Sequence, residues 1–425
     1  MPAAPRHHAN PRQLALQCLQ RWEEGGIFAE TLIQKSAQGL NSADRALLQA
    51  IVLGTLRHLR RLEHILHTLR GRRPTQAEPR RLLLCGLCQL IVLHMPGYAV
   101  VNEMVNLAPP RVRGLVNGVL RQAIRRAAEW EAELGQLPPG VRYSMPDWLV
   151  ERWLARWGEP ECCALLESMS RPAAVCVRTN TLKPLPAIPA DWLPVPGAPG
   201  WYKLTGSGLP LEAIHAGQVY VADPSTRYSL ELLAPRAGER VLDTCAAPGG
   251  KSAGILSATR GECSLLATDA EAHRLPTLRE NLLRAGAAQA RVEQHDWTHP
   301  CPEAWRGAFD AVLVDAPCSN SGVFGRRVDA RWRLTPKELK KLCRTQLTIL
   351  QHALQALRPG GRLVYSTCSI EEEEDRGIVQ ELLNRHPELE LEREILALPH
   401  REQADGAYAA LLRLPSRQAT STHSS

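Results

Sequence analysis

Two cysteines, each placed in a short polar loop, are the residues of this chain best suited to covalent chemistry. Cys318 lies in the motif Asp-Ala-Pro-Cys-Ser (residues 315–319) and Cys368 in Ser-Thr-Cys-Ser (residues 366–369). Each motif follows an apolar run typical of a strand. Because a cysteine thiolate is a strong nucleophile, the two motifs predict a thiolate enzyme.

One reaction that needs such a thiolate is methylation of a pyrimidine at carbon 5, which is a poor nucleophile by itself. A thiolate adds at carbon 6, electron density moves to carbon 5, and carbon 5 attacks the methyl group of a cofactor. A base then removes the carbon 5 proton and the thiol is eliminated, a step that a second cysteine can assist. Asp315, just before Cys318, can stabilise the charge that builds near ring N3. Amino-directed methyltransferases carry an Asp-Pro-Pro-Tyr motif at this strand end, so an exocyclic nitrogen is disfavoured as the target.

A glycine turn upstream of both cysteines is suited to a nucleotide-like cofactor. Residues 241–243 form a strand-like run, and residues 244–252 (Thr-Cys-Ala-Ala-Pro-Gly-Gly-Lys-Ser) indicate a tight turn and a helix start. The turn lacks the Gly-x-Gly-x-x-Gly motif of dinucleotide enzymes. It also lacks a Walker A loop, because Ala246 stands where the first glycine is needed.

Two aspartates downstream indicate which class of cofactor the turn would bind. Asp269 ends the second predicted strand, where a carboxylate can accept both ribose hydroxyls of a nucleoside, and this placement favours S-adenosylmethionine or a related adenosine cofactor. Asp296, just past the third strand, is a candidate for the adenine edge. The alternatives are a helix N-cap for Asp269 and a turn residue for Asp296.

The elements that position these residues alternate between strand and helix from about residue 238. Such a pattern predicts an α/β fold, a parallel sheet with helices on both faces. Helices are expected after Lys251, Ala272, Thr335 and Glu371. The predicted strands are residues 240–243, 265–269, 290–294, 311–315 and 362–366.

The first third of the chain has a different pattern. Apolar residues recur at helical spacing from about residue 10 to 135, with Ser42 as a candidate N-cap. A stretch rich in proline and tryptophan follows, with short strands expected around residues 174–178 and 218–222. The predicted domains are an all-helical domain (1–137), a small α+β connector (138–222), an α/β domain (223–415) and a disordered tail (416–425).

The charge is uneven along the chain. Its net charge is +7, and residues 1–140 hold 18 Lys and Arg against 10 Asp and Glu. Arginine groups at residues 57–61, 70–73 and 80–81 could track an RNA backbone. A second basic stretch, residues 326–344, could hold phosphates beside Cys318, with Trp332 available for stacking. Solvated helix faces are the alternative for both.

Other patterns exclude classes of protein. No apolar run has the length that a membrane span needs, and residues 1–11 lack the apolar core of a signal peptide, so a cytoplasmic protein is expected. Its 12 cysteines are therefore expected to be reduced. His295 and His299 lack partners at zinc spacing, so no metal is predicted. The acidic run at residues 371–375 is interpreted as a solvated first helical turn.

The motifs at residues 246–251, 315–319 and 367–369, with Asp269, resemble those of the RNA 5-cytosine methyltransferases, and within them the RsmB (Sun) type that acts on small-subunit ribosomal RNA. The likeness covers nearly the whole chain, since residues 114–121 are similar to a NusB-type RNA-binding domain. It implies a Rossmann-like S-adenosylmethionine methyltransferase domain preceded by an all-α NusB-like domain and the connector.

The resemblance also implies roles for single residues. Cys368 would be the nucleophile and Cys318 would aid product release, an order that spacing leaves open because DNA 5-cytosine methyltransferases attack with the Pro-Cys cysteine. Lys251 has an alternative role, to orient Asp315 or the base. The implied cofactor contacts are Cys245, Ala246, Ala247, Pro248, Gly249, Gly250, Lys251, Asp269, Asp296 and Asp315.

Some positions depart from the family or stay open. Residues 319–322 and 327–329 differ from the usual family motifs on the side expected to face substrate. Arg178 and Asn180 match a motif of the connector and are candidates for packing or RNA contact.

The expected activity is S-adenosylmethionine-dependent methylation of carbon 5 of a cytosine in 16S ribosomal RNA, by a monomer acting on RNA or an early small-subunit assembly particle. The alternatives are the same chemistry on transfer RNA or large-subunit rRNA, and a non-catalytic NusB-like RNA-binding factor.

Overall fold

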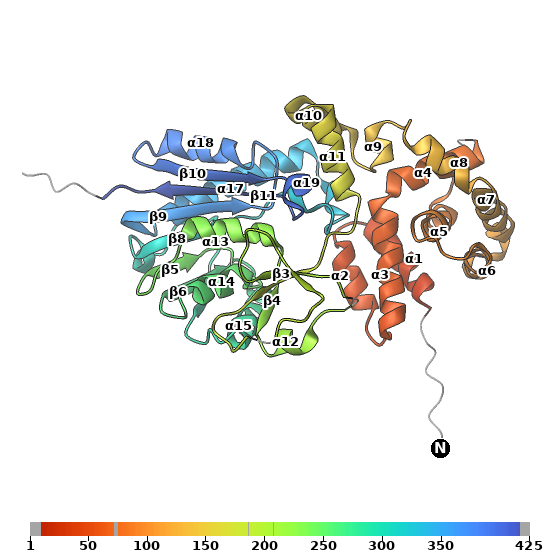
Figure 1. The fold of residues 1–425 in the computed structure, drawn as a ribbon. Coiled ribbons are helices and arrows are strands. Elements are labelled where there is room, and N and C mark those ends of the chain that lie inside the picture. Colours follow the sequence, from red (N-terminus) through yellow and green to blue (C-terminus); the bar gives the residue numbers. More distant parts are fainter. Residues whose placement is uncertain (1–9, 72–74, 186, 207, 417–425) are drawn as a thin grey trace, which may run out of the picture. The chain divides into compact units, whose positions relative to one another are not determined.

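The computed structural model describes residues 10–71, 75–185, 187–206 and 208–416 (Figure 1). Its contacts divide the chain into two compact units, residues 1–172 with 324–333, and residues 173–323 with 334–425. The four domains predicted from sequence stay a proposal. Most of the predicted tail, residues 417–425, lies outside the described residues, as do Arg72 and Arg73.

The first unit is helical, as predicted. A core of leucine, isoleucine and valine side chains joins its helices, among them Leu48, Leu62 and Leu83. Asn41, not Ser42, caps the third helix, because the Asn41 side chain accepts a hydrogen bond from the Asp44 N–H at 2.8 Å. The helices are α1 (Pro11–Glu23), α2 (Ala29–Ser36), α3 (Ser42–Arg57), α4 (Leu59–Arg70), α5 (Ala77–Leu87), η1 (Cys88–Val92), α6 (Gly97–Leu107), η2 (Pro110–Val112), α7 (Arg113–Arg125), α8 (Ala127–Leu134), α9 (Pro139–Arg142), α10 (Asp147–Trp157), α11 (Glu159–Met169) and α16 (Ala330–Arg333).

Residues 324–333 belong to this helical unit although they follow the Cys318 loop in sequence. Val328 lies in its core, and the fully buried Arg331 donates hydrogen bonds to the carbonyls of Ser144 and Met169. The Trp332 indole N–H donates to the Leu56 carbonyl at 2.9 Å. The prediction that Arg331 holds an RNA phosphate is therefore wrong, because its side chain is buried in the helical unit. Stacking of a base on the half-buried Trp332 stays a prediction.

The arginine groups predicted to track RNA are likewise tied within the protein. Arg57 is buried and donates to the Gly325 carbonyl at 3.0 Å. Arg60 makes a two-pronged contact with Asp147, at 2.6 and 2.9 Å. Arg80 and Arg81 both pair with Glu23. These guanidinium groups have protein partners, so a phosphate-facing role for them is not supported.

A small antiparallel sheet opens the second unit, in the order β2-β3-β1-β4. Its strands are β1 (Cys176–Thr179), β2 (Trp192–Pro194), β3 (Trp201–Leu204) and β4 (Val219–Val221). The helix α12 (Leu211–His215) lies between β3 and β4, and η3 (Pro224–Thr226) follows β4. Arg178 donates to the Gly250 carbonyl at 2.9 Å, and Asn180 donates to the carbonyls of Gly217 and Ala285. Of the two roles considered for these residues, their contacts are those of packing.

A seven-stranded sheet forms the rest of the unit, in the order β10-β11-β9-β8-β5-β6-β7. The five predicted strands are confirmed and run parallel. The last two strands, β10 and β11, are antiparallel and were not predicted. In β10, charged residues interrupt the strand pattern of the sequence. The strands are β5 (Arg240–Asp243), β6 (Ser264–Asp269), β7 (Arg291–Gln294), β8 (Phe309–Asp315), β9 (Leu357–Thr367), β10 (Glu390–Ala397) and β11 (Ala407–Arg413).

Helices cover both faces of this sheet, so alternate strand residues pack on opposite sides. One set of helices lies on each face of the sheet (Figure 1). Leu313 of β8 packs with one set, whereas Val312 and Val314 pack with the other. The first set is α13 (Arg227–Leu233), α14 (Gly250–Ala258) and α15 (Leu275–Arg284), and the second is α17 (Pro336–Leu354) and α18 (Arg376–Arg385). The shorter helices η4 (Ala272–Arg274), η5 (Glu303–Trp305), η6 (Ser321–Val323) and α19 (Pro399–Glu402) lie in the loops. None of the helices in the described ranges combines the length and hydropathy that a membrane crossing requires.

Candidate active site

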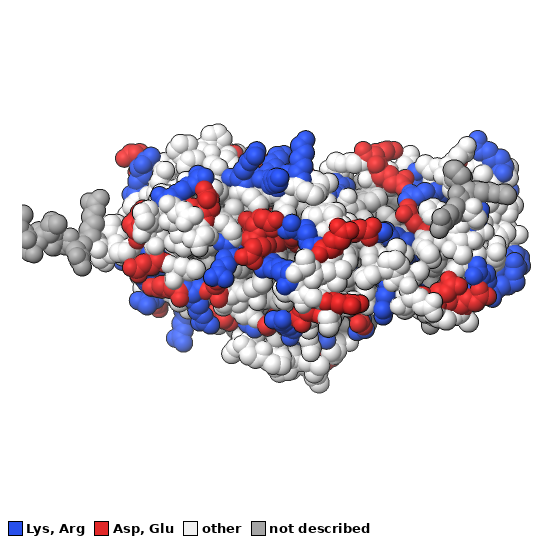
Figure 2. Space-filling view, turned by 90° about the horizontal axis from the view of Figure 1, so that it is seen from above, with Lys and Arg blue, Asp and Glu red and all other residues white. Residues whose placement is uncertain are grey.

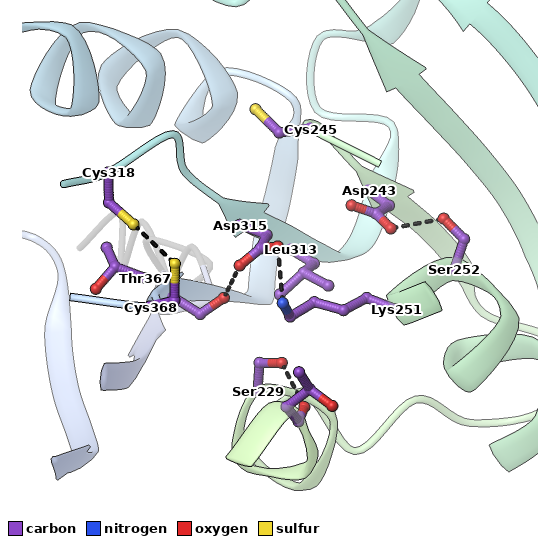
Figure 3. A network of polar contacts seen from close by, with 12 residues as sticks. Ser229, Asp243, Cys245, Lys251, Ser252, Leu313, Asp315, Cys318, Thr367 and Cys368 are labelled. Carbon is purple, nitrogen blue, oxygen red and sulfur yellow. Dashed lines mark hydrogen bonds and ion pairs between the residues drawn. The ribbon is translucent and has the colours of Figure 1, made fainter. Parts of the chain in front are cut away.

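Four neighbouring parallel strands bring the predicted site residues to one edge of the sheet. β6, β5, β8 and β9 lie side by side and end at Asp269, Asp243, Asp315 and Thr367. Because parallel strands end at the same edge, the loops that follow them meet there. Figure 3 shows Lys251, Asp315, Cys318 and Cys368 gathered at this edge.

The glycine turn after β5 forms one wall of a cavity of about 210 Å³. Gly249 has a φ of +109°, which side-chain-bearing residues rarely adopt, and it leads directly into α14. Gly249, Asp269 and Asp296 do not line the cavity. The predicted cofactor residues that do are Cys245, Ala246, Ala247, Pro248, Gly250, Lys251 and Asp315.

Sequence reasoning missed Tyr220 and Asp243, which also line this cavity. Tyr220 packs so closely over the turn that a Cβ at Gly250 would lie 2.9 Å from its ring. The signal for Asp243 was its position as the last strand residue before the turn. No sequence signal indicated Tyr220, because its strand β4 is distant along the chain.

Asp243 is fully buried and only half satisfied. Its Oδ2 accepts a hydrogen bond from the Ser252 hydroxyl at 2.6 Å, whereas its Oδ1 has no hydrogen-bond partner among the described residues. Burial raises the pKa of Asp243 to about 7, although the Ser252 hydrogen bond opposes the shift. A buried carboxylate oxygen without a partner is costly, so this wall of the cavity is suited to a cationic or hydrogen-bond-donating group.

Asp269 supports the glycine turn through a hydrogen bond to its backbone. Its Oδ2 accepts from the Ala247 N–H and its Oδ1 from the Glu271 N–H, both at 3.1 Å. Asp296 lies in a turn after β7, where its Oδ1 accepts from the Thr298 N–H at 2.9 Å. Burial favours a higher pKa for Asp296, but the hydrogen bonds from Thr298 outweigh it and lower the pKa. Cofactor contact by either aspartate stays a prediction.

Lys251 joins the glycine turn to Asp315 through an ion pair. Its ammonium group lies 2.7 Å from Asp315 Oδ2, and Asp315 Oδ1 accepts from the Ser366 hydroxyl at 2.8 Å (Figure 3). Burial acts to lower the pKa of Lys251, but the charge of Asp315 outweighs it and raises the pKa. Lys251 thus orients Asp315, the alternative considered for it, and also lines the cavity.

The two thiols are in direct contact. The Sγ atoms of Cys318 and Cys368 lie 3.1 Å apart, and the Cys368 thiol donates to Asn320 Oδ1 at 3.3 Å. Asn320 in turn donates to the Cys318 carbonyl at 3.0 Å. The hydrogen bond to Cys368, followed by burial, raises the pKa of Cys318 well above its ordinary value. Cys245 lies apart from this pair (Figure 3).

Glu374 connects the two cysteine loops through hydrogen bonds. Its carboxylate accepts hydrogen bonds from the Ser319 N–H at 2.8 Å, the Ser369 hydroxyl at 2.6 Å and the Gln346 amide at 2.9 Å. Gln346 also donates to the Pro317 carbonyl. Glu374 was predicted to be a solvated residue, and this is wrong. Glu371, Glu374 and Asp375 are all buried, because the chain folds this segment back under the thiols before α18 begins.

A second, smaller cavity lies beside the nucleophile candidate. It measures about 30 Å³ and is lined by Lys251, Cys368, Ser229 and Tyr408, among others. Lys251 and Thr226 line both this cavity and the larger one. The turn that would hold a cofactor and the thiol that would attack a base are therefore neighbours. In the described ranges no group of three or more His, Cys, Asp or Glu residues could hold a metal ion.

Comparison with known proteins gives two family matches. A family described as 16S rRNA methyltransferase RsmB/F matches residues 230–416, and the NusB family matches residues 9–125. Ribosomal RNA small subunit methyltransferase B of Vibrio cholerae is 35% identical, over 95% of this chain and 97% of its own. The enzyme of the same name from Erwinia tasmaniensis is 32% identical, over 95% of this chain and 98% of its own.

A solved structure shows the same fold. The methyltransferase homolog protein from Pyrococcus horikoshii is 27% identical, with a TM-score of 0.56 over 65% of this chain and 97% of its own. The Rossmann-like methyltransferase fold and the NusB-like helical domain predicted from sequence are thereby confirmed.

Proposed function

Because the chain belongs to the RsmB/F family of 16S rRNA methyltransferases, which depend on S-adenosylmethionine, we propose that it methylates carbon 5 of a cytosine in 16S rRNA through a covalent cysteine adduct. The observation that carries this proposal is the contact between Cys318 and Cys368, 3.1 Å apart, next to the paired Lys251 and Asp315. Amino-group methylation needs no such thiol pair. If ribosomal RNA is the substrate, the protein acts in the cytoplasm.

The residues around the larger cavity fit the cofactor. S-adenosylmethionine would supply the methyl group, and its amino-acid end carries an ammonium group that the unpartnered Asp243 Oδ1 could accept. The glycine turn lets the ligand approach the backbone at Ala246 and Ala247. Asp269 and Asp296, at the ends of neighbouring strands, would hold the nucleoside.

Cys368 is proposed as the nucleophile and Cys318 as the residue that aids release. The direct contact of the two thiols supports a division of roles, because one thiol can act as an acid toward the other. The Cys318 S–H is within hydrogen-bond reach of Cys368 Sγ. It can therefore stabilise the negative charge that Cys368 regains when it leaves carbon 6. Asp315, oriented by Lys251 and Ser366, would face ring N3.

Substitution of each cysteine tests the division of roles. Cys368→Ala should abolish methyl transfer and form no adduct. Cys318→Ala should still attack and should accumulate a covalent complex with RNA, seen as a slow-migrating band on a denaturing gel. An absence of adduct in the Cys318 variant, with cofactor binding intact, would refute the proposed roles.

Two further measurements test the activity and its target. Calorimetric titration with S-adenosylmethionine separates an enzyme from a non-catalytic RNA-binding factor, which would show no binding. Bisulfite sequencing of total RNA from a deletion strain should show one cytosine of 16S rRNA that has lost its modification. If the modification is lost from transfer RNA or large-subunit rRNA instead, the target is that RNA and the proposed reaction is unchanged.

A further inference from the structure

A groove between α6 and α7 of the helical unit has the composition of a nucleic-acid site. Its volume is about 310 Å³, and its walls combine Val101 and Ile124 with the amides of Asn102 and Asn117. Tyr98 stands on its rim with 84% of its surface exposed. Its ring is therefore accessible to a ligand in the groove.

The arginines near this groove differ from those of α3, α4 and α5. Between Glu103 and Glu129 the chain has five arginines and no acidic residue. Arg111 pairs with Glu78, and Arg126 pairs with Glu129. For Arg113, Arg121 and Arg125, no carboxylate partner occurs among the described residues.

Arg121 lies on the wall of the groove itself. Its Nε donates to Asn117 Oδ1 at 2.8 Å, which holds the guanidinium group beside the groove. Figure 2 shows both basic and acidic side chains at the right-hand end of the view, the end at which Figure 1 draws α6 and α7, so the positive charge of the groove is that of Arg121 on its wall. The groove therefore offers positive charge, amide groups and an aromatic ring together.

We propose that the α6/α7 groove binds a single-stranded segment of RNA, with a base stacked on Tyr98 and a phosphate held by Arg121. Asn102 and Asn117 can each donate and accept hydrogen bonds at a base edge. Unpaired bases expose both their faces and their edges, whereas a duplex hides the faces in its stack. The groove therefore favours single strands. This inference rests on RNA being the substrate of the proposed function, and it adds where the helical unit binds it.

The test measures RNA affinity of the full chain, separately from methylation. The probe is a fluorescein-labelled single-stranded RNA of about 12 nucleotides, followed by fluorescence anisotropy at several salt concentrations. Tyr98→Ala should weaken binding ~10-fold, the scale of one lost base–aromatic stack. Tyr98→Phe, which keeps the ring, should bind nearly as well as the wild type. Arg121→Ala should weaken binding and reduce the salt slope by about one.

Two controls make the outcome specific. The first control is Arg171→Ala, which also removes one positive charge. Arg171 is exposed and pairs with Glu167 outside the groove, so this variant should change RNA binding little. The same variants on duplex RNA should lose less affinity than on single strands. Unchanged single-strand binding in both Tyr98→Ala and Arg121→Ala would overturn the inference, as would equal losses on duplex RNA. Cofactor titration and the Cys318→Ala adduct are read separately, so failure of the proposed chemistry is distinguishable from failure of the groove.

Discussion

Cys318 and Cys368 are 50 residues apart in the chain, yet their Sγ atoms lie 3.1 Å apart. Each thiol stands in the loop after one of two adjacent parallel strands, β8 and β9. The pairing Asp315↔Ser366 sets the register of these strands, and with it the meeting of the two loops. The thiol pair is thus a product of strand order and register.

The closeness of the two thiols predicts that a mild oxidant will join them. Diamide should form a Cys318–Cys368 disulfide and abolish methyl transfer, and dithiothreitol should restore activity. Mass spectrometry after alkylation would identify the linked peptides. In Cys318→Ser, the Cys368 thiol should stay free under the same treatment. The prediction would be contradicted if a disulfide elsewhere in the chain caused the inactivation.

Glu374 should control the rate of reaction without contacting substrate. Glu374→Gln replaces an acceptor by an amide donor that faces the N–H groups of Ser319 and Gln346. Because displacement of reacting groups by about 1 Å can cost ~100-fold in rate, we expect kcat to fall 10- to 100-fold with cofactor affinity unchanged. Glu372→Gln, at an exposed neighbour, is the matched control. Equal kcat in both variants would show that Glu374 does not position the thiols.

Asp243 should make the stability of the cofactor-free protein depend on pH. Its pKa is raised to about 7 in the folded state from 3.8, so the folded protein binds more protons than the unfolded chain between these values. The wild-type melting temperature should therefore fall relative to that of Asp243→Asn as pH rises from 4 to above 7. Differential scanning fluorimetry of both proteins across this pH range measures the two melting temperatures. A difference between the two proteins that stays constant over this range would contradict the buried, partly protonated state.

Residues 324–333 should be needed for the stability of the helical unit. Arg331 is fully buried, and its guanidinium group donates to the carbonyls of Ser144, Met169 and Phe324. Arg331→Met keeps similar bulk but leaves these carbonyls unpaired, which should cost about 3 kcal/mol or more. Arg333→Met, at a less buried neighbour, is the comparison. Equal thermal stability of the two variants would contradict this role.

Much of the fold was predictable because its signals are local. Strand and helix alternation after residue 238 reflects periodic burial, and five strands were placed within a few residues of their ends. The turn at Gly249 depends on neighbouring residues and was recognised from them. β10 and β11 were both missed. β10 is the edge strand of the sheet, and charged residues interrupt its strand pattern.

By itself the sequence determined which residues could do chemistry: two thiols, a lysine and a set of aspartates at strand ends. Only the tertiary structure decided which charged groups are free to act. Arg57, Arg331 and Glu374 look like solvent-facing charges in sequence, yet carbonyls, hydroxyls and amides hold them inside the protein. Their partners are distant along the chain, or are backbone and hydroxyl groups whose direction only the fold sets, so no local pattern could reveal them. For the same reason the RNA-binding surface that we propose is the groove beside Arg121 and not the predicted arginine groups.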